Sequence, residues 1–311
     1  MAKLSASEYQ KIAILIATSA LFSGSFVAGK YTTTDLGPLT TSLLRYAIAL
    51  LFLSVFLIRY KFSVLQIDRR DIVRFLLLGL FGVVGYHYFF FSSLRHTAVA
   101  NTAIINATNP ILTGFLAAIF IRERLTLKNY LGVIMSCLGV LVLLTQGDIK
   151  NLIHLDLNIG DLLMLFAVLS WIMYALIIKQ LFRKYSGFTI TYYSAVFGVL
   201  LLLGLAITEH PVQQIQAVST ASLLSILYMG IGASGLGYFL YNLSIKEIGP
   251  TKTAGFVYGC VPIFVAILAF LFFRQPITMP ILMSSALVIL GLRLMLESSQ
   301  QTQFSDRVKS S

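Results

Sequence analysis

The sequence predicts an all-α membrane protein in which ten transmembrane helices form two inverted repeats of five helices each. Of its 311 residues, 58% are hydrophobic and 11% are charged, whereas a soluble domain is about 45–50% apolar and about 25% charged. Several apolar runs are long enough to cross a bilayer, because about 20 helical residues span a hydrocarbon core of about 30 Å. These runs do not alternate between apolar and polar residues, which excludes a transmembrane β-barrel.

The predicted spans follow one another with mostly short connections. They cover residues 11–31, 38–59, 72–93, 98–121, 127–146, 159–181, 188–208, 219–242, 250–272 and 277–297. Prolines lie at or near the start of several spans, where a missing N–H costs little. A polar tail, residues 298–311, follows the last span and is expected to be cytoplasmic.

An internal repeat divides the chain into two units. The stretch NTAIINATNPILTGFLAAIFIRERLT, Asn101–Thr126, returns without a gap as TAGFVYGCVPIFVAILAFLFFRQPIT, Thr253–Thr278. The first two spans align as well, at an offset of 149 residues instead of 152. We therefore expect one unit over 11–146 and a second over 159–297. Because five is an odd number, the second unit should enter the membrane inverted, an arrangement typical of secondary transporters.

Basic residues predict the orientation of the chain. With the N-terminus inside, eighteen of the 23 Lys and Arg residues fall in inner segments, four in outer segments, and one, Arg45, within a span. Cytoplasmic segments of membrane proteins carry this excess of positive charge. Both termini are therefore expected in the cytoplasm, with the protein in the cell inner (plasma) membrane. The same rule accounts for the net charge of +11 without a nucleic-acid partner.

Short motifs in a fixed order resemble a known family. The first span contains FSGSFVAGK, the second begins with PLTTSLLRY, and the fourth contains A-x-x-x-x-x-x-P-I followed by RERLT. In this doubled frame the chain resembles the EamA family of the drug/metabolite transporter superfamily over about residues 11–297. The second unit departs from the pattern, with RQPIT in place of RERLT. The resemblance implies transport of amino acids, other small metabolites or drugs without ATP hydrolysis.

Repeat symmetry nominates a substrate site at mid-depth between the two units. The repeat pairs Phe22 with Trp171, Tyr86 with Tyr238, and Asn106 with Tyr258, while Tyr174 shares the face of Trp171. Aromatic surface with a few polar groups is the usual composition of a small-molecule pocket. The alternative is that these side chains only pack or form hydrogen bonds between helices.

Three further polar residues are candidates for the site. Arg45 lies about 10 Å from the outer end of its span, where it could attract a substrate carboxylate; snorkelling to the headgroups or a structural role is the simpler interpretation. His87 lies within a span and has no partner evident in the sequence, so it would line the path or pack. Asn101 lies near a helix end and would line the cavity or only cap the helix.

Prolines and glycines predict where helices bend or approach closely. Pro110 and Pro262 each remove a backbone hydrogen bond within a predicted span, so we expect symmetric kinks that shape the cavity. Glycines at 79, 82 and 85, and at 230, 232, 235 and 237, favour close packing of helix backbones and could also permit bending.

No motif indicates catalysis, a metal or a cofactor. Cys137 and Cys260 lie in apolar runs and have no metal-ligand spacing. We therefore expect a secondary transporter, in the exporter direction, of amino acids or amphipathic drugs, working by alternating access as a monomer or homodimer in contact with lipid. One alternative is a nucleotide-sugar-type exchanger, which would need several basic residues in its cavity. Another is a receptor or an intramembrane enzyme, and the latter would need a nucleophile and base, or a metal cluster, at membrane depth.

Overall fold

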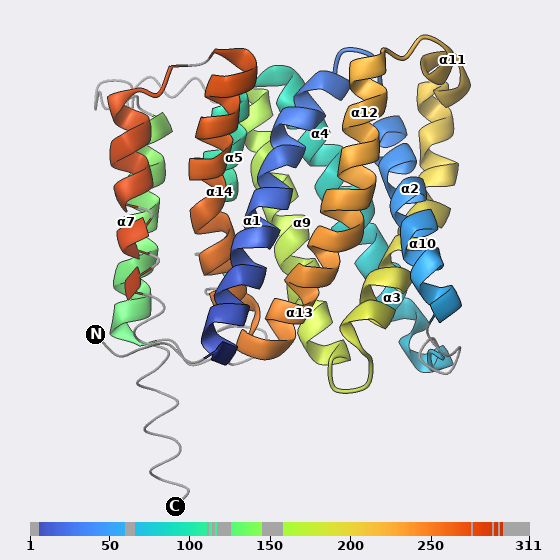
Figure 1. The fold of residues 1–311 in the computed structure, drawn as a ribbon, viewed down its shortest axis with the longest axis horizontal. Helices are drawn as coiled ribbons and strands as arrows, with labels where there is room; N and C mark the ends of the chain where they lie inside the picture. Colours follow the sequence, from blue (N-terminus) through green and yellow to red (C-terminus); the bar gives the residue numbers. More distant parts are fainter. Residues whose placement is uncertain are drawn as a thin grey trace, which may run out of the picture.

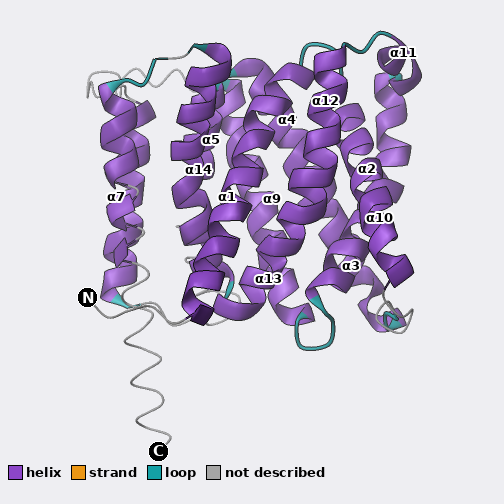
Figure 2. Ribbon diagram, in the orientation of Figure 1, coloured by secondary structure: helices purple, strands orange, loops and turns teal. Residues whose placement is uncertain are grey.

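A computed structural model describes residues 6–59, 66–110, 112–113, 116, 126–144, 158–274, 276–287, 289–291 and 293–294. Within these residues the secondary structure is helical and contains no strand. The helices stand side by side in one bundle, with their ends gathered at two opposite faces (Figures 1 and 2).

Seven helical segments of the described chain are long and apolar enough to cross a membrane. They are Tyr9–Thr32, Pro38–Val55, Arg69–His96, Ile159–Leu181, Gly187–Glu209, Thr220–Ile248 and Pro250–Phe273. The other three predicted spans overlap shorter helices, α5 (Val99–Asn106), α7 (Leu127–Leu144) and Met279–Gly291, and each of these spans includes residues that lie outside the described ranges. The protein is therefore a multi-pass membrane protein, while the total of ten spans and the inverted arrangement stay predictions.

Side chains in the preceding loops cap the N-termini of several of these helices. Asn158 caps α9 (Ile159–Leu181) by accepting a hydrogen bond from the N–H of Gly160. Ser186 caps α10 (Gly187–Leu205) in the same way. These oxygens satisfy N–H groups that have no partner within the helix. The two helices begin at residues 159 and 187, which agrees with the predicted starts of the spans at 159 and 188.

The third and eighth spans each contain a central π-helical segment. In the third span, η3 (Gly79–Gly85) separates α3 (Ile72–Leu78) from α4 (Tyr86–His96). In the eighth, η5 (Met229–Gly237) separates α12 (Thr220–Tyr228) from α13 (Tyr238–Ile248). Tyr86 and Tyr238, which the repeat aligns, are the first residues after the two π segments. Such segments are rare and are frequent at functional sites.

Glycines in and near the π segments allow neighbouring helices to approach closely. A Cβ atom on Gly79 would lie 2.7 Å from the backbone nitrogen of Gly198. One on Gly230 would lie 2.9 Å from the carbonyl oxygen of Arg45 on α2 (Pro38–Arg59). At these positions only hydrogen fits, so the packing role predicted for these glycines is confirmed.

The predicted kinks differ between the two units. α5 ends at Asn106, a turn occupies Ala107–Thr108, and helical structure resumes at Asn109. The break therefore comes before Pro110 and not at it, because a proline at the start of a helical stretch lacks only an N–H that would have no partner there. In the second unit, α14 (Pro250–Phe273) runs as one helix through Pro262. The helix is thus interrupted in the first unit and continuous through Pro262 in the second, and the symmetric kinks that shape the cavity stay a prediction.

The two halves of the chain interleave around the centre of the bundle. α1 (Ala6–Thr32) packs against α14, α12 and η5, while α9 packs against α4, α5 and η3. α2 and α10 pack against each other and flank the two π segments (Figure 1). Residues of both halves therefore meet at mid-bundle, where the largest buried side chains are aromatic.

Candidate functional site

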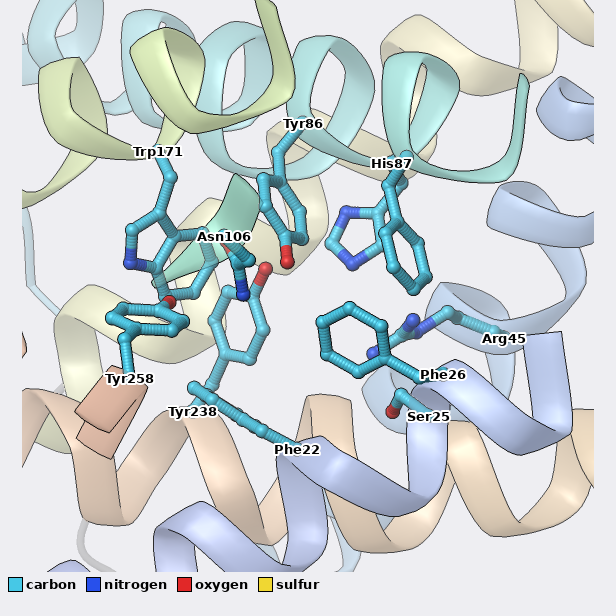
Figure 3. Close-up of a pocket in the computed structure, with 11 residues that line it drawn as sticks. Phe22, Ser25, Phe26, Arg45, Tyr86, His87, Asn106, Trp171, Tyr238 and Tyr258 are labelled. Carbon is cyan, nitrogen blue, oxygen red and sulfur yellow. The ribbon is translucent and has the colours of Figure 1, made fainter. Parts of the chain in front are cut away.

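A small cavity lies at the centre of the bundle. Its volume is about 20 Å³, which is room for roughly one water molecule. Helices α1, α2, α4, α5, α9, α13 and α14 contribute its lining, Phe22, Ser25, Phe26, Arg45, Tyr86, His87, Phe90, Asn106, Trp171, Tyr238 and Tyr258 (Figure 3). A substrate larger than water would enter only after these side chains move apart.

The cavity brings together eight of the ten residues that repeat symmetry and polarity nominated. These are Phe22, Arg45, Tyr86, His87, Asn106, Trp171, Tyr238 and Tyr258. The other two lie outside its lining. Tyr174 is fully buried behind Trp171, and its hydroxyl accepts a 3.3 Å hydrogen bond from Asn242. Asn101 is half-buried one turn from Thr97, whose hydroxyl accepts a 3.4 Å hydrogen bond from its amide.

Three lining residues were not predicted. Ser25 and Phe26 lie three and four residues after Phe22, on the same face of α1. Phe90 lies four residues after Tyr86, and the two rings stack at 5.7 Å with an interplanar angle of 5°. Helical periodicity applied to the two predicted aromatic residues would have found all three.

Trp171 lies at the centre of an aromatic wall, which it forms with the rings of Phe22, Tyr86 and Tyr238. Its ring centroid lies 5.9 Å from that of Phe22, 4.8 Å from that of Tyr86 and 4.9 Å from that of Tyr238. Its indole N–H donates a 3.0 Å hydrogen bond to the hydroxyl of Tyr241. Trp171 is only 1% exposed, so it packs inside the protein and does not face lipid. Edge-to-face pairs of this kind hold aromatic rings in defined orientations.

The π segment η3 fixes two other members of the site through its carbonyl groups. The hydroxyl of Tyr238 donates a 3.1 Å hydrogen bond to the carbonyl oxygen of Gly82. His87 Nδ1 lies 3.0 Å from the carbonyl oxygen of Val83. Because a carbonyl can only accept, Nδ1 donates this hydrogen bond. The irregular backbone thus positions one side chain from each unit.

Arg45 occupies one end of the cavity and is only 2% exposed. Its Nε donates a 2.6 Å hydrogen bond to Ser234 Oγ, and Nη1 lies 3.8 Å from the sulfur of Met229. The guanidinium also lies over the rings of Tyr46 and Phe91, 5.7 and 5.8 Å from their centroids. The snorkelling interpretation is therefore wrong, because Ser234 and the two rings hold the guanidinium inside the bundle.

Asn106 and Tyr258 occupy the other side of the cavity (Figure 3). Both are buried. Among the described residues, neither the amide oxygen and nitrogen of Asn106 nor the hydroxyl of Tyr258 has a hydrogen-bond partner. An unsatisfied buried polar group costs about 1–3 kcal/mol. A bound molecule that supplies the missing donors and acceptors would recover that cost.

At the face predicted to be outer, loops of one half are bonded to the other half. Asp35 accepts hydrogen bonds from the backbone N–H of Ser219, at 3.0 Å, and from the hydroxyl of Ser222, at 2.6 Å. These two serines hold the pKa of the Asp35 carboxyl below its usual range. Nearby, Glu209 accepts hydrogen bonds from the N–H groups of Leu39 and Thr40 at the start of α2. We call the contact of Asp35 with Ser219 and Ser222 the outer seal.

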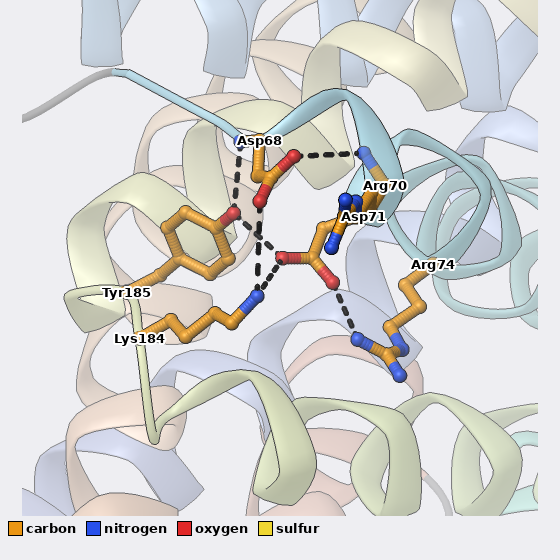
Figure 4. Close-up of polar contacts among 6 residues, drawn as sticks. All are labelled: Asp68, Arg70, Asp71, Arg74, Lys184 and Tyr185. Carbon is orange, nitrogen blue, oxygen red and sulfur yellow. Dashed lines mark hydrogen bonds and ion pairs between the residues drawn. The ribbon is translucent and has the colours of Figure 1, made fainter.

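At the opposite face, the corresponding contact is an ion pair. Lys184 Nζ lies 3.0 Å from Asp71 Oδ2, and the hydroxyl of Tyr185 donates a 2.8 Å hydrogen bond to the same oxygen (Figure 4). Arg74 pairs with the other oxygen of Asp71. Asp71 raises the pKa of Lys184 above its usual value. We call the contact of Lys184 with Asp71 the inner seal. The repeat alignment places Lys184 at the position of Asp35 in the outer seal.

Apolar spans around a small aromatic cavity, joined across both faces by contacts between the halves, define a multi-pass membrane protein of the transporter class. The chain belongs to the EamA-like transporter family, whose model matches residues 10–145 and again 158–297. It is 30% identical to the uncharacterized transporter YyaM of Bacillus subtilis over 91% of this chain and 93% of that protein. An uncharacterized transporter of Archaeoglobus fulgidus is 26% identical over 90% of this chain and 96% of its own length. A solved crystal structure with 21% identity aligns with a TM-score of 0.70 over 92% of this chain and 98% of that one, which shows the shared fold.

Proposed function

We propose that this transporter moves small organic solutes by alternating access, with the aromatic cavity as its binding site and the two seals as its gates. The observation that carries the proposal is the position of the cavity between contacts that join the two halves at both faces. In alternating access, one seal opens while the other stays closed. With both seals formed and a cavity of about 20 Å³, this conformation corresponds to an occluded intermediate.

The composition of the cavity favours a small amphipathic solute over a nucleotide sugar. A nucleotide sugar carries one or two phosphates, and sites for phosphate usually combine several basic side chains. Arg45 is the single Lys or Arg among the lining residues. We therefore propose metabolites with aromatic or other apolar bodies as the solutes, and we propose export as the direction of their transport.

Cross-linking each seal tests the gating role. In a variant without Cys137 and Cys260, Asp35→Cys with Ser222→Cys places two thiols at the outer seal. Proteoliposomes would carry a radiolabelled panel of aromatic amino acids and aromatic carboxylates. A short bifunctional thiol reagent with a reducible linker should stop flux, and reductant should restore it.

The inner seal provides the matching test, with Lys184→Cys and Asp71→Cys. The same protein before cross-linking is the control for the loss of the native side chains. Continued flux at the uncross-linked rate, with the cross-link complete at either seal, would show that the contact does not gate the path.

We also propose an inner (plasma) membrane location with both termini in the cytoplasm, on the strength of the charge distribution. An impermeant thiol reagent applied to intact cells should label Asn151→Cys and should not label Ser310→Cys. Labelling of Ser310→Cys from outside would overturn both the orientation and the inverted arrangement of the units.

A further inference from the structure

We propose that the cavity selects organic monoanions, with the carboxylate of the ligand on Arg45 and its aromatic body against the wall around Trp171. This inference rests on the proposed function, because it assigns the ligand class of the same cavity. It is narrower than transport of amphipathic solutes in general, since it ranks anions above zwitterions and cations.

The first argument is the unpaired charge of Arg45. Arginine stays protonated in proteins, and no aspartate or glutamate of the described residues forms an ion pair with it. Its guanidinium has five N–H donors, of which Nε and Nη1 have partners in Ser234 and Met229. A charge in this position costs free energy until an anion joins it. Carboxylates match the planar fork of N–H groups.

The second argument concerns what the cavity does not offer to a cation. None of its eleven lining residues is acidic. The aromatic rings could attract an ammonium group by their faces, but the guanidinium of Arg45 already lies over two of the neighbouring rings. A second positive charge nearby would be repelled, because Coulomb energies are large where water is excluded.

The third argument is the separation of the polar groups. Arg45 lies on one side of the cavity, whereas Asn106 and Tyr258 lie on the other, with aromatic rings between them (Figure 3). The carboxylate and ammonium of an α-amino acid are bonded to the same carbon atom, so one such molecule would not place them on both sides. A carboxylate at one end of an aromatic body fits the arrangement, with a polar group at the far end for Asn106 and Tyr258.

The single tryptophan of the chain makes binding directly measurable. Trp171 is the only tryptophan, and it lines the cavity, so a change in its fluorescence reports occupancy of this site. Three probes share one phenyl body: 3-phenylpropionate carries the carboxylate alone, phenethylamine the ammonium alone, and phenylalanine both. Purified full-length protein in detergent should bind 3-phenylpropionate most tightly and phenethylamine most weakly.

Variants of Arg45 separate charge from shape. Arg45→Met should weaken 3-phenylpropionate binding by about tenfold to a hundredfold, as expected for lost hydrogen bonds to a charged group. The same variant should leave phenethylamine binding unchanged or tighter, because the repulsion is removed. Arg45→Lys keeps the charge but not the planar fork, so its affinity for 3-phenylpropionate should lie between those of the parent and Arg45→Met. Arg183→Met removes a positive charge from an exposed position outside the cavity and should change neither ligand.

The outcomes distinguish this inference from the proposed function. Parent protein that binds phenethylamine or phenylalanine more tightly than 3-phenylpropionate overturns the anion inference, and flux of those solutes in proteoliposomes would leave the transport proposal standing. An equal effect of Arg45→Met and Arg183→Met on 3-phenylpropionate also overturns it. Arg45-dependent binding of 3-phenylpropionate without any flux would instead support the anion site and contradict transport.

Discussion

Substitution of Gly82 by alanine should damage both the stability and the site. A Cβ atom there would lie 2.7 Å from Cε2 and 2.8 Å from Cγ of Tyr174, so the ring or the helix must move. Overpacking of this kind costs about 1–3 kcal/mol. Tyr174 has no exposed surface and packs on Trp171 and Tyr238, so its displacement reaches the aromatic wall directly.

The backbone of Gly82 adds a second effect. Its carbonyl oxygen accepts the hydrogen bond from Tyr238, so a shift of η3 would also release that side chain from its position in the cavity. We expect Gly82→Ala to lower the melting temperature in detergent and to alter the fluorescence of Trp171, because both aromatic neighbours of the indole change position.

Gly204 on α10 provides a matched control, because a Cβ atom there meets nothing within 4 Å. Alanine is more favourable than glycine within a helix by about 0.5–1 kcal/mol. Gly204→Ala should therefore melt at the parental temperature or above it. If Gly82→Ala melts as high as Gly204→Ala and keeps the parental fluorescence, the close contact with Tyr174 does not limit the packing of the third span.

The remaining predictions concern the wall, the helix break and the inner seal. Trp171→Ala and Asn106→Ala should each weaken solute binding by roughly 1–3 kcal/mol, through lost aromatic contact or a lost hydrogen bond. Calorimetry can measure the affinity of each variant for 3-phenylpropionate, and parental affinity in both variants would contradict the prediction. Pro110→Ala should change transport rates more than the yield of folded protein, and equal kinetics would make the break at residues 107–108 passive. Because Asp71 raises the pKa of Lys184, the inner seal should persist at neutral pH and be lost as the pH rises through that raised pKa. The difference in melting temperature between the parent and Lys184→Met should then vanish at strongly alkaline pH, and a difference that is constant with pH would exclude the ion pair as its source.

The aromatic side of the cavity could be predicted because the repeat carries spatial information. Residues at equivalent positions of two related units meet near the axis between them, which brought Phe22 together with Trp171 and Tyr86 with Tyr238. The repeat alignment alone was enough to predict these two pairs of residues. Hydrophobic length alone was enough for the seven spans of the described chain.

Other features depended on tertiary structure. The depth of Arg45 in its span follows from the sequence, but the direction of its side chain depends on Ser234, which is 189 residues away along the chain. Glycine spacing predicted close approach in the third span, yet helix propensity does not distinguish a π segment from an α-helix, so η3 was not foreseen. The break before Pro110 depended on where the helix resumes, which the proline alone does not determine.

The two seals differ in chemistry although the repeat aligns Asp35 with Lys184. The outer seal is a carboxylate that accepts hydrogen bonds from neutral serines, whereas the inner seal is an ion pair with a buried aspartate. Two identical inverted units would give inward-open and outward-open states of equal free energy. The unequal side chains at the two faces remove that equality, and a difference of 1.4 kcal/mol changes the ratio of the two states about tenfold. Under the proposed alternating access, the seals are therefore where this sequence sets the resting direction of the transporter, independently of the residues that line its cavity.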